Sequence, residues 1–274
     1  MTVNLISRTE GFGVLEGKNL EEIIEYTARV SNPSNQAKDL PAGKLLKYLA
    51  KHSHWSPFEM VSVCLEVNTT RDIARQLLRH RSFFFQEFSQ RYADPTSDLA
   101  FSTREARLQD MKNRQNSLQT NDNELKSQWE AKQQQMIHEA SLAYEWAVNN
   151  GIAKEQARSV LPEGNTNSRL YVHGTIRSWI HYIQLRTTPG TQKEHMDLAK
   201  ECAEAISPVF PLIMDYVYKD ISPEEAYDIV LNEAAIRMRK SMSGARNQTL
   251  SMYDSLDYWV MEVTREFMKE GKIK

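Results

Sequence analysis

Apolar and polar residues alternate most clearly over residues 60–68, which predicts a β-strand with one apolar face. The apolar positions are Val61, Val63, Leu65 and Val67. Thr69 follows, and Asp72 three residues later completes a pair that is typical of a helix start. The helical spacing continues through Ile73, Leu77 and His80. We therefore expect a strand and then a helix, with residues 79–81 at the helix C-terminus.

Helical spacing also predicts a helix from Leu20 that stops at Asn32-Pro33, and a second one opened by Pro41. Residues 3–15 suit a short strand or hairpin. A strand over 170–175 is expected to lead into a helix over 176–186.

Helices are expected to dominate after Pro189. Near the end, an apolar stripe at helical spacing favours core or subunit packing over a ligand role. Its members are Leu256, Trp259, Val260, Val263 and Phe267.

Residues 95–132 are expected to form a polar excursion or helical flap, since they are rich in Asn, Gln and charge and poor in large apolar residues. A helical core pattern returns at Leu142, Trp146 and Ile152. Asn149-Asn150-Gly151 should end that helix, because Asn and Gly tolerate the left-handed cap conformation. We expect one domain over 1–220 and a helical C-terminal extension over 221–274.

Composition narrows the classes of protein. The net charge of −2 disfavours a protein that coats nucleic acid, which would need excess Lys and Arg to neutralise phosphates. No apolar run approaches the roughly 20 residues that span a bilayer, and the first residues do not resemble a signal peptide, so a cytoplasmic protein is expected. Cys64 and Cys202 are too few and too isolated for a zinc site or a disulfide framework, and no metal is expected.

The richest chemistry lies between Arg79 and Tyr92. If residues 86–92 are extended, Glu87, Ser89 and Arg91 project from one face. Such a set suits a ligand with N–H donors and an anionic group. On the preceding helix three arginines are one turn apart and could contact phosphate, although a solvated helix face is the expectation for the first of them. They are Arg71, Arg75 and Arg79. The spacing alone leaves an anion site and a purely structural role equally open.

Three alternatives come from other classes. A nucleic-acid module would use these arginines on phosphates and the neighbouring phenylalanines for stacking, but the net charge argues against it. A helical scaffold would explain the C-terminal stripe but not the Arg–His–Arg cluster. A nicotinamide-binding Rossmann enzyme lacks its G-x-G-x-x-G motif here.

The central motif is Arg79-His80-Arg81, seven residues and then Ser89, with Glu87 and Arg91-Tyr92 beside the serine. This motif and three others, in order, resemble those of the flavin-dependent thymidylate synthases. Upstream, residues 54–59 (His-Trp-Ser-Pro-Phe-Glu) are similar to the family's H-x-[ST]-P-F-E element. Downstream, residues 158–162 resemble its R-x-x-L-P turn, and Leu185-Arg186 with Gln192-Lys-Glu194 its L-R…Q-x-E segment.

The resemblance implies an α+β fold with a mixed sheet flanked by helices. It implies reductive methylation of dUMP to dTMP, with methylenetetrahydrofolate as carbon donor and NADPH reducing a bound FAD. A thymidylate synthase of the other type would need an activated cysteine, and neither cysteine here stands in such a motif. The family's active sites are shared between subunits of a homotetramer. Partners are therefore small molecules and other copies of the chain, with no nucleic acid or membrane.

The resemblance also implies roles for residues. Arg186 is the expected catalytic residue, stabilising negative charge that develops on the uracil. Ser89 is expected to bind substrate and not to act as a nucleophile. The expected dUMP-binding residues are Gln76, Arg79, Glu87, Ser89, Arg91, Arg158 and Arg186. The expected FAD-binding residues are Ser31, Ser56, Glu59, Arg79, His80, Arg81, Thr175, Arg177 and His181. The remaining histidines (His52, His54, His173 and His195) are expected to be structural or on the surface.

Overall fold

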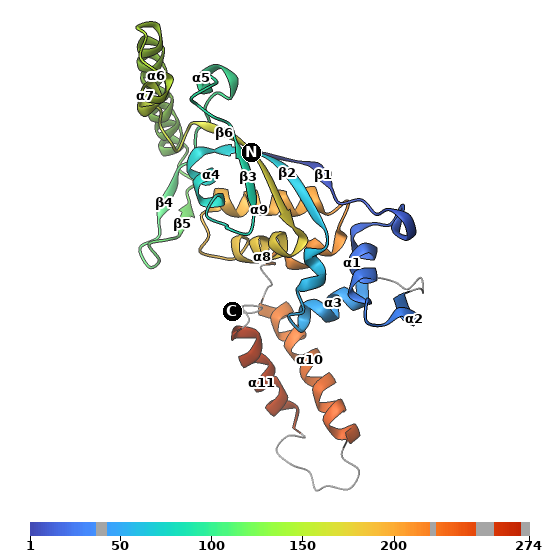
Figure 1. The fold of residues 1–274 in the computed structure, drawn as a ribbon. Coiled ribbons are helices and arrows are strands. Elements are labelled where there is room, and N and C mark those ends of the chain that lie inside the picture. Colours follow the sequence, from blue (N-terminus) through green and yellow to red (C-terminus); the bar gives the residue numbers. More distant parts are fainter. Residues whose placement is uncertain (37–42, 220–222, 245–254, 270–274) are drawn as a thin grey trace. The chain divides into compact units, whose positions relative to one another are not determined.

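A computed structural model describes residues 1–36, 43–219, 223–244 and 255–269 (Figure 1). The chain divides into two compact units, Met1–Tyr218 and Lys219–Lys274. The predicted helix opening at Pro41 begins, as far as described, at Gly43, since Pro41 itself lies outside the described residues.

A four-stranded sheet organises the first unit, in the order β1-β2-β6-β3. The strands are β1 (Thr2–Arg8), β2 (Ser62–Thr70), β3 (Phe84–Glu87) and β6 (Asn167–Thr175). Every neighbouring pair is antiparallel, so the expected mixed sheet is wrong. The reason is that β2 and β3 run in the same direction but do not touch, because β6 is inserted between them with the opposite direction.

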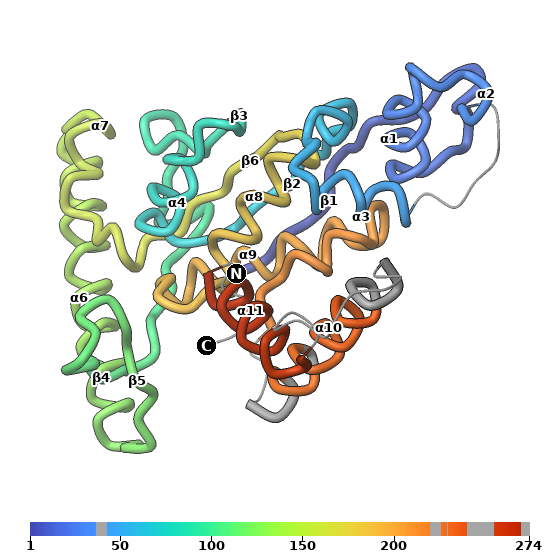
Figure 2. Tube along the Cα trace, turned by 90° about the horizontal axis from the view of Figure 1, so that it is seen from below, coloured from blue at the N-terminus to red at the C-terminus, as the bar shows by residue number. Residues whose placement is uncertain are grey.

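The two faces of the sheet differ. On β2 the predicted alternation is confirmed, since Val63, Leu65 and Val67 are fully buried. They pack with α8 (Ile176–Arg186) and α9 (Lys193–Ile206), which lie side by side along one face of the sheet (Figures 1 and 2). The other face is polar and open, and there Tyr171 Oη donates to Glu66 at 2.9 Å.

Short elements lie at one end of the sheet, and all of them except α2 add residues to the core. They are η1 (Gly13–Leu15), α1 (Leu20–Ala28), α2 (Pro33–Gln36), α3 (Gly43–Lys51) and η2 (Ser56–Glu59). The helix from Leu20 was expected to stop at Asn32-Pro33, but it ends at Ala28 and Pro33 opens α2 instead. Proline fits this position because the first helical residue needs no backbone N–H. Behind α9, η4 (Pro211–Tyr216) closes the core.

The polar excursion lies at the opposite end (Figure 2). It contains α5 (Pro95–Asp98), the hairpin β4 (Arg107–Gln109) and β5 (Ser117–Gln119), and the start of α6 (Asn123–Asn149). The expected core positions on α6 and after it are wrong: Leu142, Trp146 and Ile152 are exposed by 47%, 64% and 40%. Tyr144 and Ala147 are buried instead, against the turn formed by α7 (Lys154–Ala157) and η3 (Arg158–Val160).

The second unit is a helical hairpin of α10 (Pro223–Gly244) and α11 (Leu256–Lys269). Val263 and Phe267 are buried against Val230 and Ala234, with Trp259 and Val260 packed at the edge. The apolar stripe predicted near the end of the chain is therefore packing surface. Arg237 ties the two helices together by donating to Glu266 at 2.6 Å.

Candidate active site

The Arg–His–Arg segment forms a tight turn between α4 (Arg71–Leu77) and β3. Thr70, and not the expected Thr69, is the residue that precedes the helix, which ends just before residues 79–81 as predicted. The His80 N–H donates to the Leu77 carbonyl at 3.0 Å, so the chain turns at once. This turn leaves the Arg79 and Arg81 side chains exposed and directs His80 inward.

Packing beneath the turn holds it in place. The Phe83 ring lies 4.4 Å from that of Trp179 on α8 and presses on β6 at Gly174. A Cβ at Gly174 would come within 2.3 Å of the Phe83 ring, so only glycine leaves room for it there. Long-range packing therefore fixes the position of residues 79–81.

Arg186, the expected catalytic residue, lies at the end of α8 directly beneath this turn. Its Nε donates to His80 Nε2 at 3.0 Å. Burial, and then the charges of Arg186 and Arg79, lower the pKa of His80 to about 4. The imidazole is therefore neutral at ordinary pH and accepts a hydrogen bond, which orients the guanidinium without neutralising its charge.

A second cluster, the Glu87 group, lies at the end of β3. It consists of Glu87, Arg71, Arg75 and Ser168. The Glu87 carboxylate accepts a 2.9 Å hydrogen bond from Ser168 Oγ and pairs with Arg75 at 3.2 Å and Arg71 at 3.8 Å. Arg71 was expected on a solvated helix face; this was wrong, because Glu87 draws its side chain inward. No pattern in the sequence marked Arg71, Arg75 and Ser168 as partners of Glu87.

The expected extended run over 86–92 is wrong beyond Glu87. The Ser89 carbonyl accepts from the Tyr92 N–H at 3.1 Å, so a turn follows the strand. The turn sends Arg91 toward Glu155, with which it pairs at 3.1 Å. Glu87, Ser89 and Arg91 therefore do not share one strand face.

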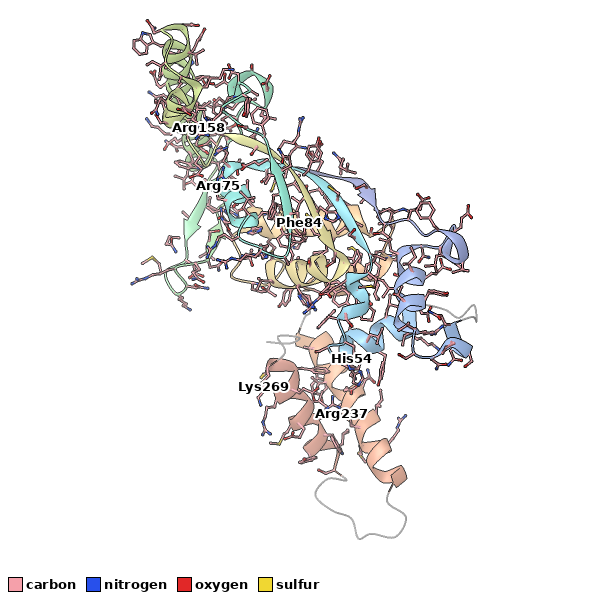
Figure 3. The ribbon with its side chains drawn as sticks, viewed as in Figure 1. His54, Arg75, Phe84, Arg158, Arg237 and Lys269 are labelled. Atoms are coloured by element: carbon pink, nitrogen blue, oxygen red, sulfur yellow. The ribbon has the colours of Figure 1, made fainter. Side chains whose placement is uncertain are left out.

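Arg158 lines a pocket in this region together with Arg71, Gln90 and Glu155. Figure 3 shows Arg158 and Arg75 at the same end of the sheet, with Phe84 farther along β3. Arg158 thus lines the same pocket as Arg71 and Glu155, the partners of the expected dUMP residues Glu87 and Arg91. In the described part of the chain, no hydrogen bond or ion pair joins them to Arg186.

Besides the residues of the turn, three of the expected FAD residues lie in one region: Glu59, Arg177 and His181. Glu59 pairs with Arg177 at 2.5 Å, and the rings of His181 and Trp55 lie nearly perpendicular with 4.8 Å between their centres. Burial lowers the pKa of His181, with a further contribution from Arg177. Two of the remaining candidates, Ser56 and Ser31, are exposed.

Thr175 already has a structural role, because its hydroxyl accepts from the Ser178 N–H at 3.3 Å and caps α8. The structure therefore brings Glu59, Arg177 and His181 into one region. Among the described residues, no hydrogen bond or ion pair joins Ser31 to them.

Neither cysteine is prepared for nucleophilic attack. Burial raises the pKa of both thiols, and Cys202 is fully buried. Within the described ranges, no group of three His, Cys, Asp or Glu side chains could hold a metal ion. Nor does any described helix have the length and apolar character to cross a bilayer.

The family model described as "Thymidylate synthase complementing protein" matches residues 14–212. The chain belongs to the flavin-dependent thymidylate synthase family. A probable flavin-dependent thymidylate synthase of Paramecium bursaria Chlorella virus 1 is 50% identical over 214 residues, covering 78% of this chain and 97% of the relative. A flavin-dependent thymidylate synthase of Synechocystis is 45% identical over 215 residues, with the same two coverages of 78% and 97%.

Solved structures agree with this family. A UMP/dUMP methylase, PolB from Streptomyces cacaoi bound with 5-Br dUMP, matches with a TM-score of 0.64 and 25% identity over 78% of this chain and 93% of that chain. As a member of this family, the chain methylates dUMP to dTMP with FAD as its cofactor. Methylenetetrahydrofolate and NADPH are the co-substrates expected for the family. The matched residues end before the α10–α11 hairpin.

Proposed function

We propose that Arg186 is the residue that stabilises the transition state on the uracil ring. The observation that carries this proposal is the hydrogen bond from Arg186 to a neutral His80. A carboxylate in that place would cancel the charge of the guanidinium, whereas a neutral imidazole orients it and leaves the charge available. A preorganised cation of this kind favours negative charge that develops on a ring carbonyl during reaction.

The Glu87 group and the Arg–His–Arg turn with Arg186 are proposed to share the binding of dUMP. Arginine suits the phosphate because its planar fork can donate two hydrogen bonds at once. Glu87 can accept from the N–H of the base or from a hydroxyl. The proposed binding residues are Gln76, Arg79, Glu87, Ser89, Arg91, Arg158 and Arg186.

The residues at the turn have the chemistry that FAD requires. Arg79 and Arg81 are exposed and form no ion pair within the described ranges, so their donors are available to a pyrophosphate. Phe84, 73% exposed, offers an aromatic face beside them in the sequence. The proposed contacts are Ser31, Ser56, Glu59, Arg79, His80, Arg81, Thr175, Arg177 and His181. When bound, FAD supplies the redox chemistry, and the protein residues bind, orient and exclude water.

A homotetramer with shared sites is proposed as the working form. It is supported by the fact that, among the described residues, no hydrogen bond or ion pair joins the Glu87 group to Arg186. A second copy could supply one group to the other. The cytoplasm is the proposed location, which agrees with two cysteines that are both free.

The test is turnover by purified protein loaded with FAD, followed as tritium release from 5-tritiated dUMP with NADPH and methylenetetrahydrofolate. Arg186→Ala should lower kcat by about 100- to 1,000-fold, the loss typical of removing one preorganised group that stabilises charge. Arg114→Ala, at an exposed position on the β4–β5 hairpin, is the matched control and should keep full activity. Full activity in Arg186→Ala would refute the proposed role.

A further inference from the structure

Gln76, at the last turn of α4, is the first member of a hydrogen-bonded chain that runs behind the candidate site. Its Nε2 donates to Gln192 Oε1 at 2.8 Å, and Gln192 Nε2 donates to Glu194 Oε2 at 3.0 Å. On its other side, Gln76 Oε1 lies 3.2 Å from His195 Nδ1. Gln192, Glu194 and His195 all come from the start of α9 or the residue before it.

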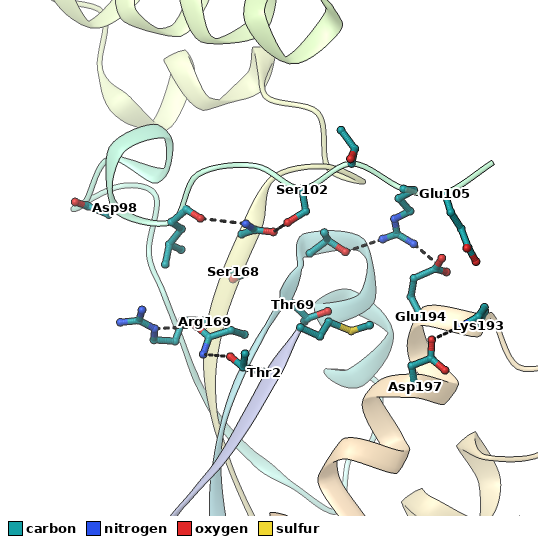
Figure 4. Close-up of a pocket in the computed structure, with 17 residues that line it drawn as sticks. Thr2, Thr69, Asp98, Ser102, Glu105, Ser168, Arg169, Lys193, Glu194 and Asp197 are labelled. Carbon is teal, nitrogen blue, oxygen red and sulfur yellow. Dashed lines mark hydrogen bonds and ion pairs between the residues drawn. The ribbon is translucent and has the colours of Figure 1, made fainter. Parts of the chain in front are cut away.

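Glu194 sets the direction of every bond in this chain. Its carboxylate pairs with Arg104 at 3.0 Å and with Arg107. Figure 4 shows Glu194 near Lys193, with a dashed line from its carboxylate to a guanidinium group. Burial raises the pKa of Glu194, but hydrogen bonds from the backbone and Gln192 and the charges of the two arginines outweigh burial and lower it. An ionised carboxylate only accepts hydrogen bonds, so Gln192 must turn its amide nitrogen toward Glu194.

The orientations of Gln76 and His195 are fixed in the same way. Gln192 presents its oxygen to Gln76, so Gln76 must donate there and keep its own oxygen on the His195 side. His195 must therefore carry its proton on Nδ1. Burial, with the nearby Arg186 and His80, lowers the pKa of His195 to about 3, which keeps the ring neutral. The hydrogen bond to Gln76 then selects the tautomer with the proton on Nδ1.

We infer that His195 and Gln192 are positioning residues that lock the amide of Gln76 in one of its two orientations for the bound nucleotide. The Gln76 amide has a second N–H, which donates to none of the residues of this hydrogen-bonded series. With the amide locked, Gln76 always offers that donor to a ligand. Without the lock, a flip of the amide would present oxygen instead and cost one hydrogen bond. This inference rests on the proposed role of Gln76 in dUMP binding.

The location of His195 supports a role through Gln76 and not through direct contact. Its side chain is fully buried, 5.7 Å from the ring of Tyr182 and 6.2 Å from that of His80, measured between centres. No pattern in the sequence indicated this arrangement, since Gln76 is 116 residues from Gln192 and 119 residues from His195.

The test compares three substitutions of His195 by titrating dUMP into the FAD-loaded enzyme in a calorimeter. His195→Asn keeps an N–H donor near the position of Nδ1 and should bind dUMP within about 2-fold of the wild type. His195→Gln moves the donor toward the position of Nε2, and His195→Leu removes it. Both should weaken dUMP binding about 3- to 10-fold, the effect of losing one neutral hydrogen bond. His52→Leu, at an exposed histidine that also bonds through Nδ1, is the control.

A double-mutant cycle with Gln76→Ala separates positioning from general destabilisation. If His195 acts through Gln76, then His195→Leu has no further effect on dUMP affinity once Gln76 is alanine. An equal loss in both backgrounds, or an Asn variant as weak as the Leu variant, would overturn the inference. If His195→Leu does not fold, His195→Gln serves in the same cycle. Unchanged affinity in Gln76→Ala alone would instead contradict the proposed dUMP site.

Discussion

The arginines of the α4 turn and those beside Glu87 lie close in sequence but have opposite surroundings. Arg71 and Arg75 share the carboxylate of Glu87, whereas Arg79 and Arg81 are exposed and have no ion pair in the described residues. A paired guanidinium must give up or share its carboxylate before it can bind an anion. An unpaired one loses only water. We conclude that the turn is the region prepared for new anionic contacts, whereas the ion pairs of Arg71 and Arg75 give the Glu87 group a scaffold role besides the dUMP contact proposed for Glu87.

The largest effect should come from removing an unpaired arginine. Arg79→Ala is expected to weaken dUMP binding by about 10- to 100-fold, because a hydrogen bond to a charged group contributes about 1.5–3 kcal/mol. Arg75→Ala, its counterpart one turn earlier, should change dUMP affinity far less. Calorimetric titration of both variants measures the difference. Equal losses would show that pairing with Glu87 does not distinguish the two arginines.

A smaller effect is expected from removing the carboxylate that Arg71 and Arg75 share. Glu87→Gln keeps an acceptor for Ser168 but removes the charge that holds Arg71 and Arg75. We expect the free energy of unfolding to fall by about 1 kcal/mol, the upper range for a partly exposed ion pair. Urea unfolding measures this change.

Glu163→Gln provides the matched control for that experiment. Glu163 also approaches Arg75, at 3.6 Å, but its side chain is 59% exposed. Its substitution should leave the unfolding free energy nearly unchanged. If the two variants were equally stable, the Glu87 group would not have the scaffold role assigned to it.

The last prediction concerns pH and the histidines behind the turn. The pKa of His80 is about 4 in the folded chain and near 6.5 when unfolded. The unfolded state therefore binds more protons between these values, so stability is complete above pH 6.5 and declines as pH falls toward 4. His195, with its pKa of about 3, adds to the same trend. Urea unfolding at pH 7.5 and pH 5 should show the loss, and His80→Asn should reduce it.

Much of the first unit could be predicted from local pattern. The alternation on β2 and the helix over Ile176–Arg186 were confirmed because burial on one face dictates both periodicities. The sequence pattern did not predict which residues are buried where contacts between distant segments determine burial. Leu142 and Trp146 have helical spacing, but α6 extends from the sheet at that point and buries Tyr144 instead.

The candidate site shows the same division. Motif residues such as Arg79 and Arg186 could be named from the resemblance, although their roles remain predictions. The partners that orient them could not. His80 and Arg186 are 106 residues apart, and Gln76 and His195 are 119 apart. Only the packing of α4, α8 and α9 against one sheet brings such residues together.

The pairing of Arg104 and Arg107 with Glu194 divides the excursion into a base and a tip. The base is connected to Gln76 through the ion pairs with Glu194 and the hydrogen bonds of Gln192. The tip, over residues 110–116, forms hydrogen bonds mainly within itself. A fluorophore or an affinity tag grafted into the tip would therefore leave the catalytic machinery undisturbed. Shortening the loop at its base would instead remove the ion pairs that help to orient the amide of Gln76.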